Sequence, residues 1–599
     1  MPLLASIFGG LIALYVSSFV YIFARNCVYA RKTRLPFVAI PWDQNHFFWL
    51  ILSPPLQPLL KKTMPAWLYE RTTLTIYSWE FREKLRPFAH YAKPQGNEKT
   101  FFLLTAGVPE INTCDPEVAW EIARRPGDFQ QPDINAMFMG RFGHNVLTSN
   151  GEHWSRQRKV IASVINERVS KAVFDESARQ TNGLLGEVYD TADLSTTETN
   201  RLFRMMKKIT IHVLLSAGMG QSVPWKSNGD EKPREGYKMT YIEACETVIE
   251  AVPGPIILPQ WFLSHYPGFL PGYKFIRDLG NAILEFPVHT LHLLGQERER
   301  VVNQGGDAKS NIMSQMLQAN QSDGKSAPVL SEGEMLGNLF VFTTAGFDTT
   351  ANTLSYALVL LCRYPELQDW MFEEIDTILS SDSTEPLDYN AIYPKVVRIM
   401  AIMLETLRIF VPVVHLCKGT KTAQVIETSA GTINVPPGCL TYVDVVGLHL
   451  DPNVWRDLNK APSAGTRIDC EAVANGKEDE YLFRPTRWIN PPGSPQPLFQ
   501  PPRGSYMPWS GGPRVCPGQK MAQVEFTAIF LTLFRRHRIE AVHQVIDGRD
   551  ETVQEKNARL DALMKDSISI LTLQMKGVYD AAEGGKDGKG VNVRFSKRK

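Results

Sequence analysis

The chain has 599 residues, of which 44% are hydrophobic and 21% are charged, the composition of an ordinary globular protein with a large core. Its formal net charge of +1 argues against a nucleic acid partner. The 8 cysteines are scattered along the sequence, which fits a reducing compartment better than a disulfide framework. No internal repeat or Gly/Ser-rich linker divides the middle of the sequence, so we predict one large catalytic unit at residues 46–580.

Residues 2–24 contain no charged side chain and are about as long as the twenty residues that cross a bilayer. Four basic residues follow this stretch: Arg25, Arg31, Lys32 and Arg34. A cleaved signal peptide would instead have basic residues before a shorter apolar region. We therefore predict an uncleaved transmembrane signal-anchor at 2–24 and a basic linker at 25–45, with the rest of the chain in the cytosol because positive flanking residues stay there.

The next segments predict small local structures. Residues 101–105 and 110–112 have the pattern of a β-hairpin, and 116–125 that of a short helix capped by Asp115. Further on, Trp154 and Arg158 are four residues apart, so on a helix both could hold one anion. A surface cation–π contact between these two side chains is the alternative.

Residues 253–271 place many apolar side chains between prolines, a pattern that excludes a long regular helix. Such a loop either packs on the protein body or enters lipid, and we favour lipid contact. Residues 275–302 then predict a long amphipathic helix.

Residues 332–364 have helical periodicity, but small and hydroxylated residues interrupt it at 343–350. Such residues can break the helical hydrogen bonds and open a groove that faces a ligand. A close contact between two helices is the alternative. Asp348 and Thr349 add a neighbouring acid and alcohol to this stretch.

Several weaker patterns follow. Glu405 and Arg408 lie one helical turn apart and can form an ion pair, although such pairs are common on surfaces. Residues 422–428 and 431–435 predict strands, and 460–480 a polar surface insertion. Residues 581–599 are rich in glycine and basic residues and predict a disordered tail.

Cys516 lies between glycines and prolines, directly before a predicted helix at 519–534. Backbone N–H groups and the helix dipole stabilise a thiolate at that position. A lone cysteine is more often a small buried hydrophobe. A zinc site would need nearby Cys or His partners, and a nucleophile would need a base closer than His537. A single axial thiolate to a haem iron, with Arg514 on a propionate, is the remaining option.

The cysteine segment resembles the haem-binding signature of the cytochrome P450 monooxygenases. The matching residues are Trp509, Gly512, Arg514, Cys516 and Gly518, with tryptophan at the first position, where the family usually has phenylalanine. Four further motifs of the family occur in the right order between about residues 100 and 540: Trp154/Arg158, the 345–349 stretch, Glu405/Arg408, and Arg487 before Trp488. The resemblance implies a mainly α fold with a minor β-sheet region, the haem-thiolate fold.

The resemblance also implies roles for individual residues. Cys516 would ligate the iron of haem b, and Trp154, Arg158, Arg514 and Lys418 would contact its propionates. Glu405, Arg408 and Arg487 would form a buried structural triad. Thr349 would hold bound oxygen, and Asp348 would help relay protons. Substrate-pocket candidates are Phe342, Ala345, Phe347, Val411 and Val413, all apolar, which predicts a lipophilic small-molecule substrate.

No flavin or nicotinamide segment is visible, so the resemblance implies NADPH-cytochrome P450 reductase as a separate electron donor, with cytochrome b5 as a second one. Arg156, Lys159 and Lys520 predict a positive docking face for it. The overall pattern is similar to membrane-anchored, microsomal, fungal-type members of secondary metabolism, which implies a single-pass protein of the endoplasmic reticulum membrane. A reductase-independent haem isomerase or dehydratase acting on a peroxide, and a non-enzymatic haem sensor, are the alternatives.

Overall fold

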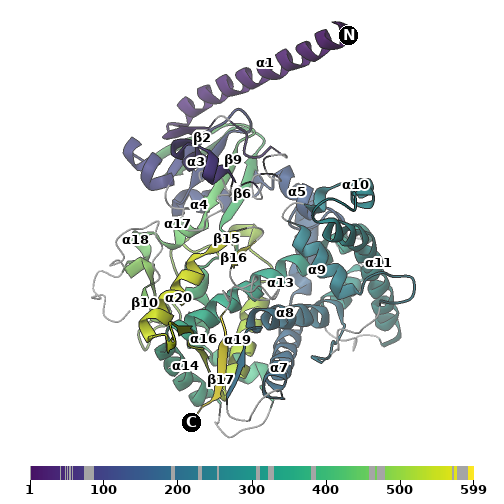
Figure 1. The fold of residues 1–599 in the computed structure, drawn as a ribbon, viewed down its shortest axis with the longest axis vertical. Helices are drawn as coiled ribbons and strands as arrows, with labels where there is room; N and C mark the ends of the chain where they lie inside the picture. Colours follow the sequence, from purple (N-terminus) through teal and green to yellow (C-terminus); the bar gives the residue numbers. More distant parts are fainter. Residues whose placement is uncertain are drawn as a thin grey trace.

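A computed structural model shows a mainly helical body with a small sheet region at one end (Figure 1). It describes residues 2–40, 42–46, 49, 52, 56, 59–72, 87–190, 196–226, 233–252, 255–304, 311–321, 329–379, 386–456, 466–467, 479–569, 572–576 and 591–598. The predicted fold class, mainly α with a minor β region, is confirmed.

The helices run in chain order from the N-terminus to the C-terminal third. They are α1 Pro2–Thr33, α3 Ala66–Thr72, α4 Pro116–Arg124, α5 Asp133–Met139, α6 Gly151–Val164, α7 Glu167–Asp190, α8 Leu202–Met219, α9 Tyr241–Ala251, α10 Gln260–His265, α11 Tyr273–Gln304, α12 Ile312–Gln321, α13 Glu332–Arg363, α14 Pro365–Ile378, α15 Tyr389–Ile392, α16 Arg398–Ile409, α17 Val445–His449, α18 Pro452–Trp455, α19 Gln519–Phe534 and α20 Val553–Lys565.

The largest sheet has the strand order β1-β2-β3-β9-β6-β4. Its strands are β1 Phe37–Ala39, β2 Thr100–Leu104, β3 Glu110–Thr113, β9 Leu440–Asp444, β6 His415–Thr420 and β4 Phe129–Gln130. The predicted hairpin is confirmed as the antiparallel pair β2 and β3, in which Phe102 faces Ile111. The predicted helix after it is α4, whose first amides donate to the Asp115 carboxylate.

Smaller sheets complete the fold. A three-stranded sheet has the order β12-β17-β5, formed by His537–Ala541, Val593–Lys597 and Thr196–Thr199. The two-stranded sheets are β7 Gln424–Thr428 with β8 Gly431–Val435, β10 Thr466–Arg467 with β11 Leu482–Phe483, β13 Val545–Ile546 with β14 Arg549–Asp550, and β15 Ser567–Ser569 with β16 Leu573–Met575. The strands predicted at 422–428 and 431–435 are confirmed by β7 and β8.

The two ends of the chain differ from their predictions. Residues 25–33, predicted as linker, continue α1, and 37–39 form β1 against β2. The Asn26 amide anchors α1 to the sheet by donating to the Thr105 carbonyl over 2.9 Å. The tail predicted to be disordered at 581–599 contains β17, because Val593 and Phe595 are buried between β12 and β5. The predicted insertion at 460–480 lies mostly outside the described residues.

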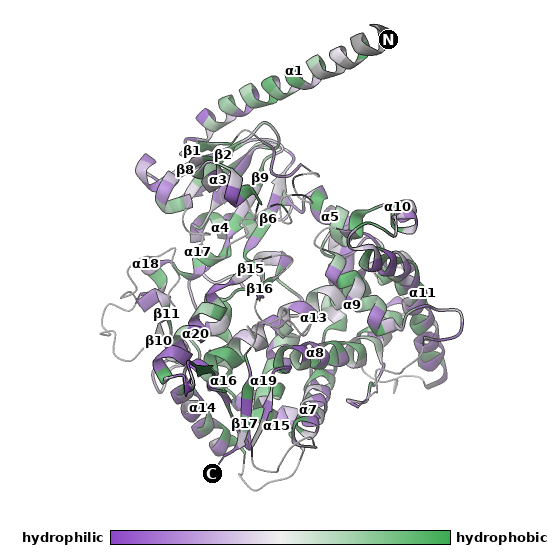
Figure 2. Ribbon diagram, in the orientation of Figure 1, coloured by the Kyte–Doolittle hydropathy of each residue, from purple (hydrophilic) through white to green (hydrophobic). Residues whose placement is uncertain are grey.

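Helix α1 extends away from the body, and Figure 2 shows hydrophobic residues along it. Leu14 is 69% exposed and Tyr15 71%. Within the described part of the chain, no helix combines the length and apolarity needed to cross a bilayer. The signal-anchor predicted at 2–24 is therefore not confirmed.

Helix α13 runs through the middle of the body and packs against α8 (Figure 1). A capping box formed by Ser331 and Glu334 begins it. The interruption predicted at 343–350 is wrong, because the helix is continuous. The hydroxyls bond back to carbonyls four residues earlier, as in Thr343 to Leu339 at 2.8 Å and Thr349 to Ala345 at 2.6 Å, and so stay within the helical turn.

Candidate functional site

The cysteine loop is a tight turn that leads into α19. The Cys516 N–H donates to the Trp509 carbonyl over 2.8 Å and closes the turn. Gly512 has a φ of 64°, and a Cβ there would lie 2.5 Å from the Ala123 carbonyl oxygen of α4, so only glycine fits. Gly518 likewise lies against the sulfur, since its added Cβ would be 3.8 Å from Sγ. The loop therefore holds one thiol at the N-terminus of α19.

The Cys516 side chain is exposed to solvent, although neighbouring protein atoms surround its sulfur on the other sides. Burial raises the pKa of this thiol, while the Gly518 and Gln519 N–H groups and the Arg158 charge oppose the rise. The two N–H groups and the Arg158 charge therefore favour the thiolate, but they do not lower the pKa of the thiol below its ordinary value. This donor set suits a thiolate whose charge is shared with a metal.

Three cations, Arg514, Lys418 and Arg158, lie around the cysteine loop. Arg514 donates to the Ser149 carbonyl and to the Asn150 side chain, both over 2.9 Å, and its guanidinium lies 4.4 Å from the Trp154 ring centroid. Its Nε is buried and has no partner among the described residues. Burial lowers the pKa of Arg514 to about 10. The arginine therefore has a donor left for a further acceptor.

Lys418, on β6, is buried next to this arginine. Burial, and then the Arg514 charge, lower the pKa of Lys418 to about 7. Burial also lowers the pKa of Arg158, on α6. In the described part of the chain, none of these three cations forms an ion pair with a carboxylate. A buried lysine beside a half-buried arginine is costly without a counterion, so the site fits an anionic group. Haem would supply both this group, as propionates, and the metal for Cys516.

The open face of α13 carries Phe342, Ala345 and Thr349, which are separated by three and four residues. Because the Thr349 proton is committed to the Ala345 carbonyl, its remaining lone pairs can accept a hydrogen bond from a ligand. Asp348 lies about 100° around the helix from Thr349 and is only 8% exposed. Its carboxylate accepts a hydrogen bond from Thr572 instead. The Asp348 carboxylate and the Thr349 hydroxyl, which were predicted to act together, therefore point in different directions.

The five predicted pocket residues divide into two groups. Ala345 and Val413 are exposed and Phe342 is half-buried, so these three can line an open space. Phe347 and Val411 are buried in the core, and their assignment to the pocket is wrong. Phe347 lies on the α8 side of α13, where the Lys207 ammonium is 5.7 Å from its ring centroid.

The structure brings Glu405, Arg408 and Arg487 together as the sequence predicted. Glu405 accepts from Arg408 Nε and Nη2 over 2.8 and 2.9 Å and from Arg487 Nε over 2.9 Å. The Arg484 amide and the Trp488 indole also donate to it, over 2.8 and 2.9 Å. Burial raises the pKa of Glu405, but the two guanidinium charges outweigh it and lower the pKa to about 2.

Sequence reasoning missed His449, which joins this triad to the cysteine loop. Its Nε2 accepts from the Met507 amide over 2.9 Å, and its Nδ1 lies 3.2 Å from the Arg408 carbonyl. Burial lowers the pKa of His449 to about 3, so the ring is neutral, with its proton on Nδ1. No local motif marks this residue, because its partners are 41 and 58 positions away.

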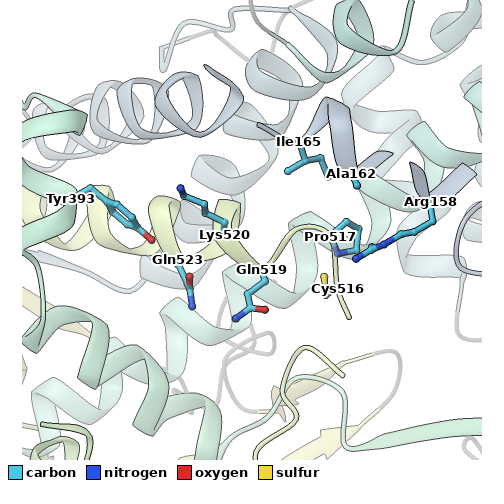
Figure 3. A pocket seen from close by; sticks show the side chains of 9 residues that line it. All are labelled: Arg158, Ala162, Ile165, Tyr393, Cys516, Pro517, Gln519, Lys520 and Gln523. Carbon is cyan, nitrogen blue, oxygen red and sulfur yellow. The ribbon is translucent and has the colours of Figure 1, made fainter. Parts of the chain in front are cut away.

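A hollow of about 470 Å³ lies beside the cysteine, between the first residues of α19 and α6 (Figure 3). It is lined by Arg158, Ala162, Ile165, Tyr393, Cys516, Pro517, Gln519, Lys520 and Gln523. The positive face predicted around it is weaker than expected. Arg156 is paired with Glu334 at 2.5 Å, and Lys520 is paired with Glu167. Lys159 is exposed on α6.

Comparisons with known proteins agree on one family. The family model described as Cytochrome P450 matches residues 80–460 and 481–561. A cytochrome P450 monooxygenase of the phomenoic acid biosynthesis cluster of Leptosphaeria maculans is 38% identical, over 94% of this chain and 95% of that protein. A cytochrome P450 monooxygenase of Arthrobotrys oligospora is 27% identical, over 94% and 96%. The crystal structure of the cytochrome P450DA heme domain has the same fold, with a TM-score of 0.59 and 16% identity over 94% of this chain and 99% of that one.

Proposed function

The chain belongs to the cytochrome P450 family, and the relatives described above are monooxygenases. From that premise we propose that it oxidises a lipophilic intermediate of fungal secondary metabolism. Electrons would come from NADPH through a separate reductase. The observation that carries the proposal is the placement of one thiol, Cys516, beside Arg158 and in the same loop as Arg514, whose Nε is unpartnered and whose charge reaches Lys418.

Bound haem supplies the activation of dioxygen and the insertion of one oxygen atom into the substrate. Cys516 would hold the iron through its thiolate, and the N–H groups of Gly518 and Gln519 would stabilise the negative charge of that thiolate. Arg514, through its unpaired Nε, and Lys418 would hold the propionates, with Arg158 and the Trp154 ring nearby. These residues would thereby favour one orientation of the bound group.

Thr349 would hold a proton donor, such as a water, on the open face of α13, where the substrate would react. Its own proton is held by the Ala345 carbonyl, so its oxygen acts as an acceptor next to the open space. A hydroxyl in that position keeps a proton-bearing ligand or water in place while general-acid catalysis occurs. Asp348, whose carboxylate accepts from Thr572 and does not point at Thr349, would supply the proton only by way of water.

Two features support the substrate class. Ala345 and Val413 are apolar and exposed, as expected of residues that contact a lipophilic ligand. The relative with 38% identity is named for the phomenoic acid biosynthesis cluster, which supports a role in secondary metabolism for this chain as well.

Exposed apolar groups support attachment to the endoplasmic reticulum membrane, with the catalytic domain in the cytosol. Trp261 on α10 is 67% exposed, and Phe269 in the following loop is 86% exposed. Together with the apolar residues of α1, these side chains would enter the lipid interface. The reductase, with cytochrome b5 as a second donor, would dock at the hollow beside Cys516, and Lys159, exposed on α6 next in the chain to the Arg158 that lines the hollow, would offer a charge to an acidic partner.

The test is product formation by purified protein with candidate lipophilic substrates. We expect product only when dioxygen, NADPH and the reductase are all present. An isomerase or dehydratase acting on a peroxide would form product without the reductase and NADPH, and a haem sensor would form none. Either outcome would refute the proposal.

A matched pair of variants tests the role of Thr349. Thr349→Ala should lower product per NADPH at least tenfold, since general acid–base catalysis contributes about 10²–10⁴-fold, and hydrogen peroxide should rise. Thr353→Ala removes an equivalent hydrogen bond to the carbonyl four residues earlier, of 2.8 Å, from a buried position one turn on. It should leave product per NADPH near the wild-type value. Equal effects of the two variants would contradict the role of Thr349.

A further inference from the structure

Helix α11 carries an apolar strip on the face that it turns to solvent. The helix lies along one edge of the body, where its inner face packs against α9 and α12 (Figure 1). On its outer face Leu284 is 55% exposed, Val288 50% and Leu291 37%. These three residues follow one another at spacings of four and three, so they form one continuous strip along the helix. Because the outer face of a surface helix is normally polar, the strip is a candidate contact surface.

Charged side chains bound the apolar strip at both ends. Arg277 and Asp278 lie before the strip, and Arg298 and Glu299 lie after it. In the part of the chain that the structure describes, none of these four side chains forms an ion pair. Each end of the strip therefore offers one positive and one negative group to a partner.

The order of these charges matches a second copy of the same helix that runs in the opposite direction. Arg277 and Glu299 lie eleven residues before and after Val288. Asp278 and Arg298 lie ten residues before and after it. When two antiparallel copies meet at Val288, each arginine of one copy thus faces an acid of the other. A pair with twofold symmetry requires a surface that complements itself, and this surface does so.

Lipid is the other occupant that an apolar strip could have. The strip is only about 10 Å long, and it lies between two clusters of charges on the same helix. A hydrocarbon layer would leave these charges without partners, whereas a second copy of the helix supplies a partner for each of them. The charges therefore favour a second copy.

We propose that the outer face of α11 is a self-association surface, through which two copies of this chain pair as antiparallel helices centred on Val288. Leu284 of one copy packs against Leu291 of the other, and Val288 packs against its own counterpart. The apolar strip supplies most of the contact energy, because exposed ion pairs add little. The charges fix the direction and the register of the two helices. This inference does not depend on the reaction that the protein catalyses.

The oligomeric state of the full-length protein in detergent tests the surface. Analytical ultracentrifugation should find an equilibrium between monomer and dimer. Val288→Asp should raise the dissociation constant at least tenfold, because the new carboxylate would be buried without a partner. Val545→Asp is the matched control, since Val545 is 71% exposed on β13, and it should leave the dissociation constant unchanged. A protein that stays monomeric, or a dimer that survives Val288→Asp, would overturn the proposal.

An exchange of charges tests the antiparallel register. Arg277→Glu should weaken the dimer because two acids then face each other, and Glu299→Arg should weaken it because two bases do. The double variant with both changes should restore the wild-type dissociation constant. A double variant that is weaker than either single variant would overturn the antiparallel arrangement.

Cysteine cross-linking locates the centre of the contact and needs only a small change at an exposed position. Helices packed roughly 8–10 Å apart bring facing Cα atoms to about 5 Å, which is within the range of a disulfide. Val288→Cys should therefore form a disulfide with its own counterpart under mild oxidation, and Val545→Cys should not. Arg277→Cys should cross-link to a copy that carries Glu299→Cys but not to itself. If Val288→Cys forms no disulfide and Val288→Asp instead lowers liposome binding, lipid occupies the strip and the proposal is overturned.

Discussion

Replacing Glu405 with glutamine tests the buried triad most directly. The carboxylate is fully buried and accepts hydrogen bonds from Arg408, Arg487, Trp488 and the Arg484 amide. A glutamine keeps the size of the side chain, but it removes the negative charge and presents its own NH₂ donors to a group of donors. Arg408 would then lose its carboxylate partner in a fully buried site, and Arg487 would keep only Asp479, which it shares with Arg484.

Two estimates of the cost agree. Removing one partner of a buried ion pair costs about 3–5 kcal/mol. A pKa of about 2 for Glu405, against an ordinary 4.5, corresponds to roughly 3 kcal/mol. Because the folded-state pKa is the lower one, this contribution is fully present above about pH 4.5 and is lost as the pH falls toward 2. The Glu405→Gln variant should lack this pH-dependent contribution to the free energy of unfolding.

The assay is urea unfolding followed by tryptophan fluorescence, together with the ferrous–carbon monoxide spectrum of the folded fraction. Glu405→Gln should lower the free energy of unfolding by about 3 kcal/mol or more and reduce the population with a thiolate spectrum, since His449 links Arg408 to the cysteine loop. The control is Glu121→Gln, which breaks a surface pair of the same i,i+3 spacing with Arg124 and should be indistinguishable from wild type. A loss below 1 kcal/mol for Glu405→Gln, or an equal loss for the control, would refute the reasoning.

Three further predictions follow from the charges and surfaces. The pKa of Lys418 is about 7, and an anionic propionate beside it would raise that pKa, so haem binding at pH 8 should take up a proton. Calorimetry in buffers of different ionisation enthalpy measures this uptake. Lys418→Met should abolish the proton uptake, and an unchanged uptake in this variant would contradict the contact between Lys418 and the propionate. Lys159→Ala should slow reduction by the reductase and flatten the salt dependence of that rate. Arg156→Ala should mainly lower stability, because Arg156 is paired with Glu334. If stopped-flow kinetics show slower reduction for Arg156→Ala and not for Lys159→Ala, Lys159 is not part of the docking face. Replacing both Trp261 and Phe269 with aspartate should reduce liposome binding at least tenfold, and unchanged sedimentation with vesicles would show that these side chains do not enter lipid.

Features determined by close neighbours in the chain could be predicted from the sequence. The Asp115 cap, the β2–β3 hairpin and the Glu405–Arg408 pair depend on spacings of one to four residues or on a short turn. The same holds for Cys516, which precedes a helix after glycines and prolines. Because helical and extended backbones fix the geometry of such neighbours, the residues alone specify these contacts.

The tertiary structure decided which face of each helix meets which neighbour. The sequence fixes the angle of about 100° between Asp348 and Thr349, but only the packing of the C-terminal hairpin turns the acid toward Thr572, which is 224 residues away. In the same way α8 covers Phe347 and removes it from the predicted pocket. Strand pairing buries Val593 and Phe595 in a tail whose composition predicted disorder. Contacts between residues this distant depend on the total arrangement of the core, which no local pattern encodes.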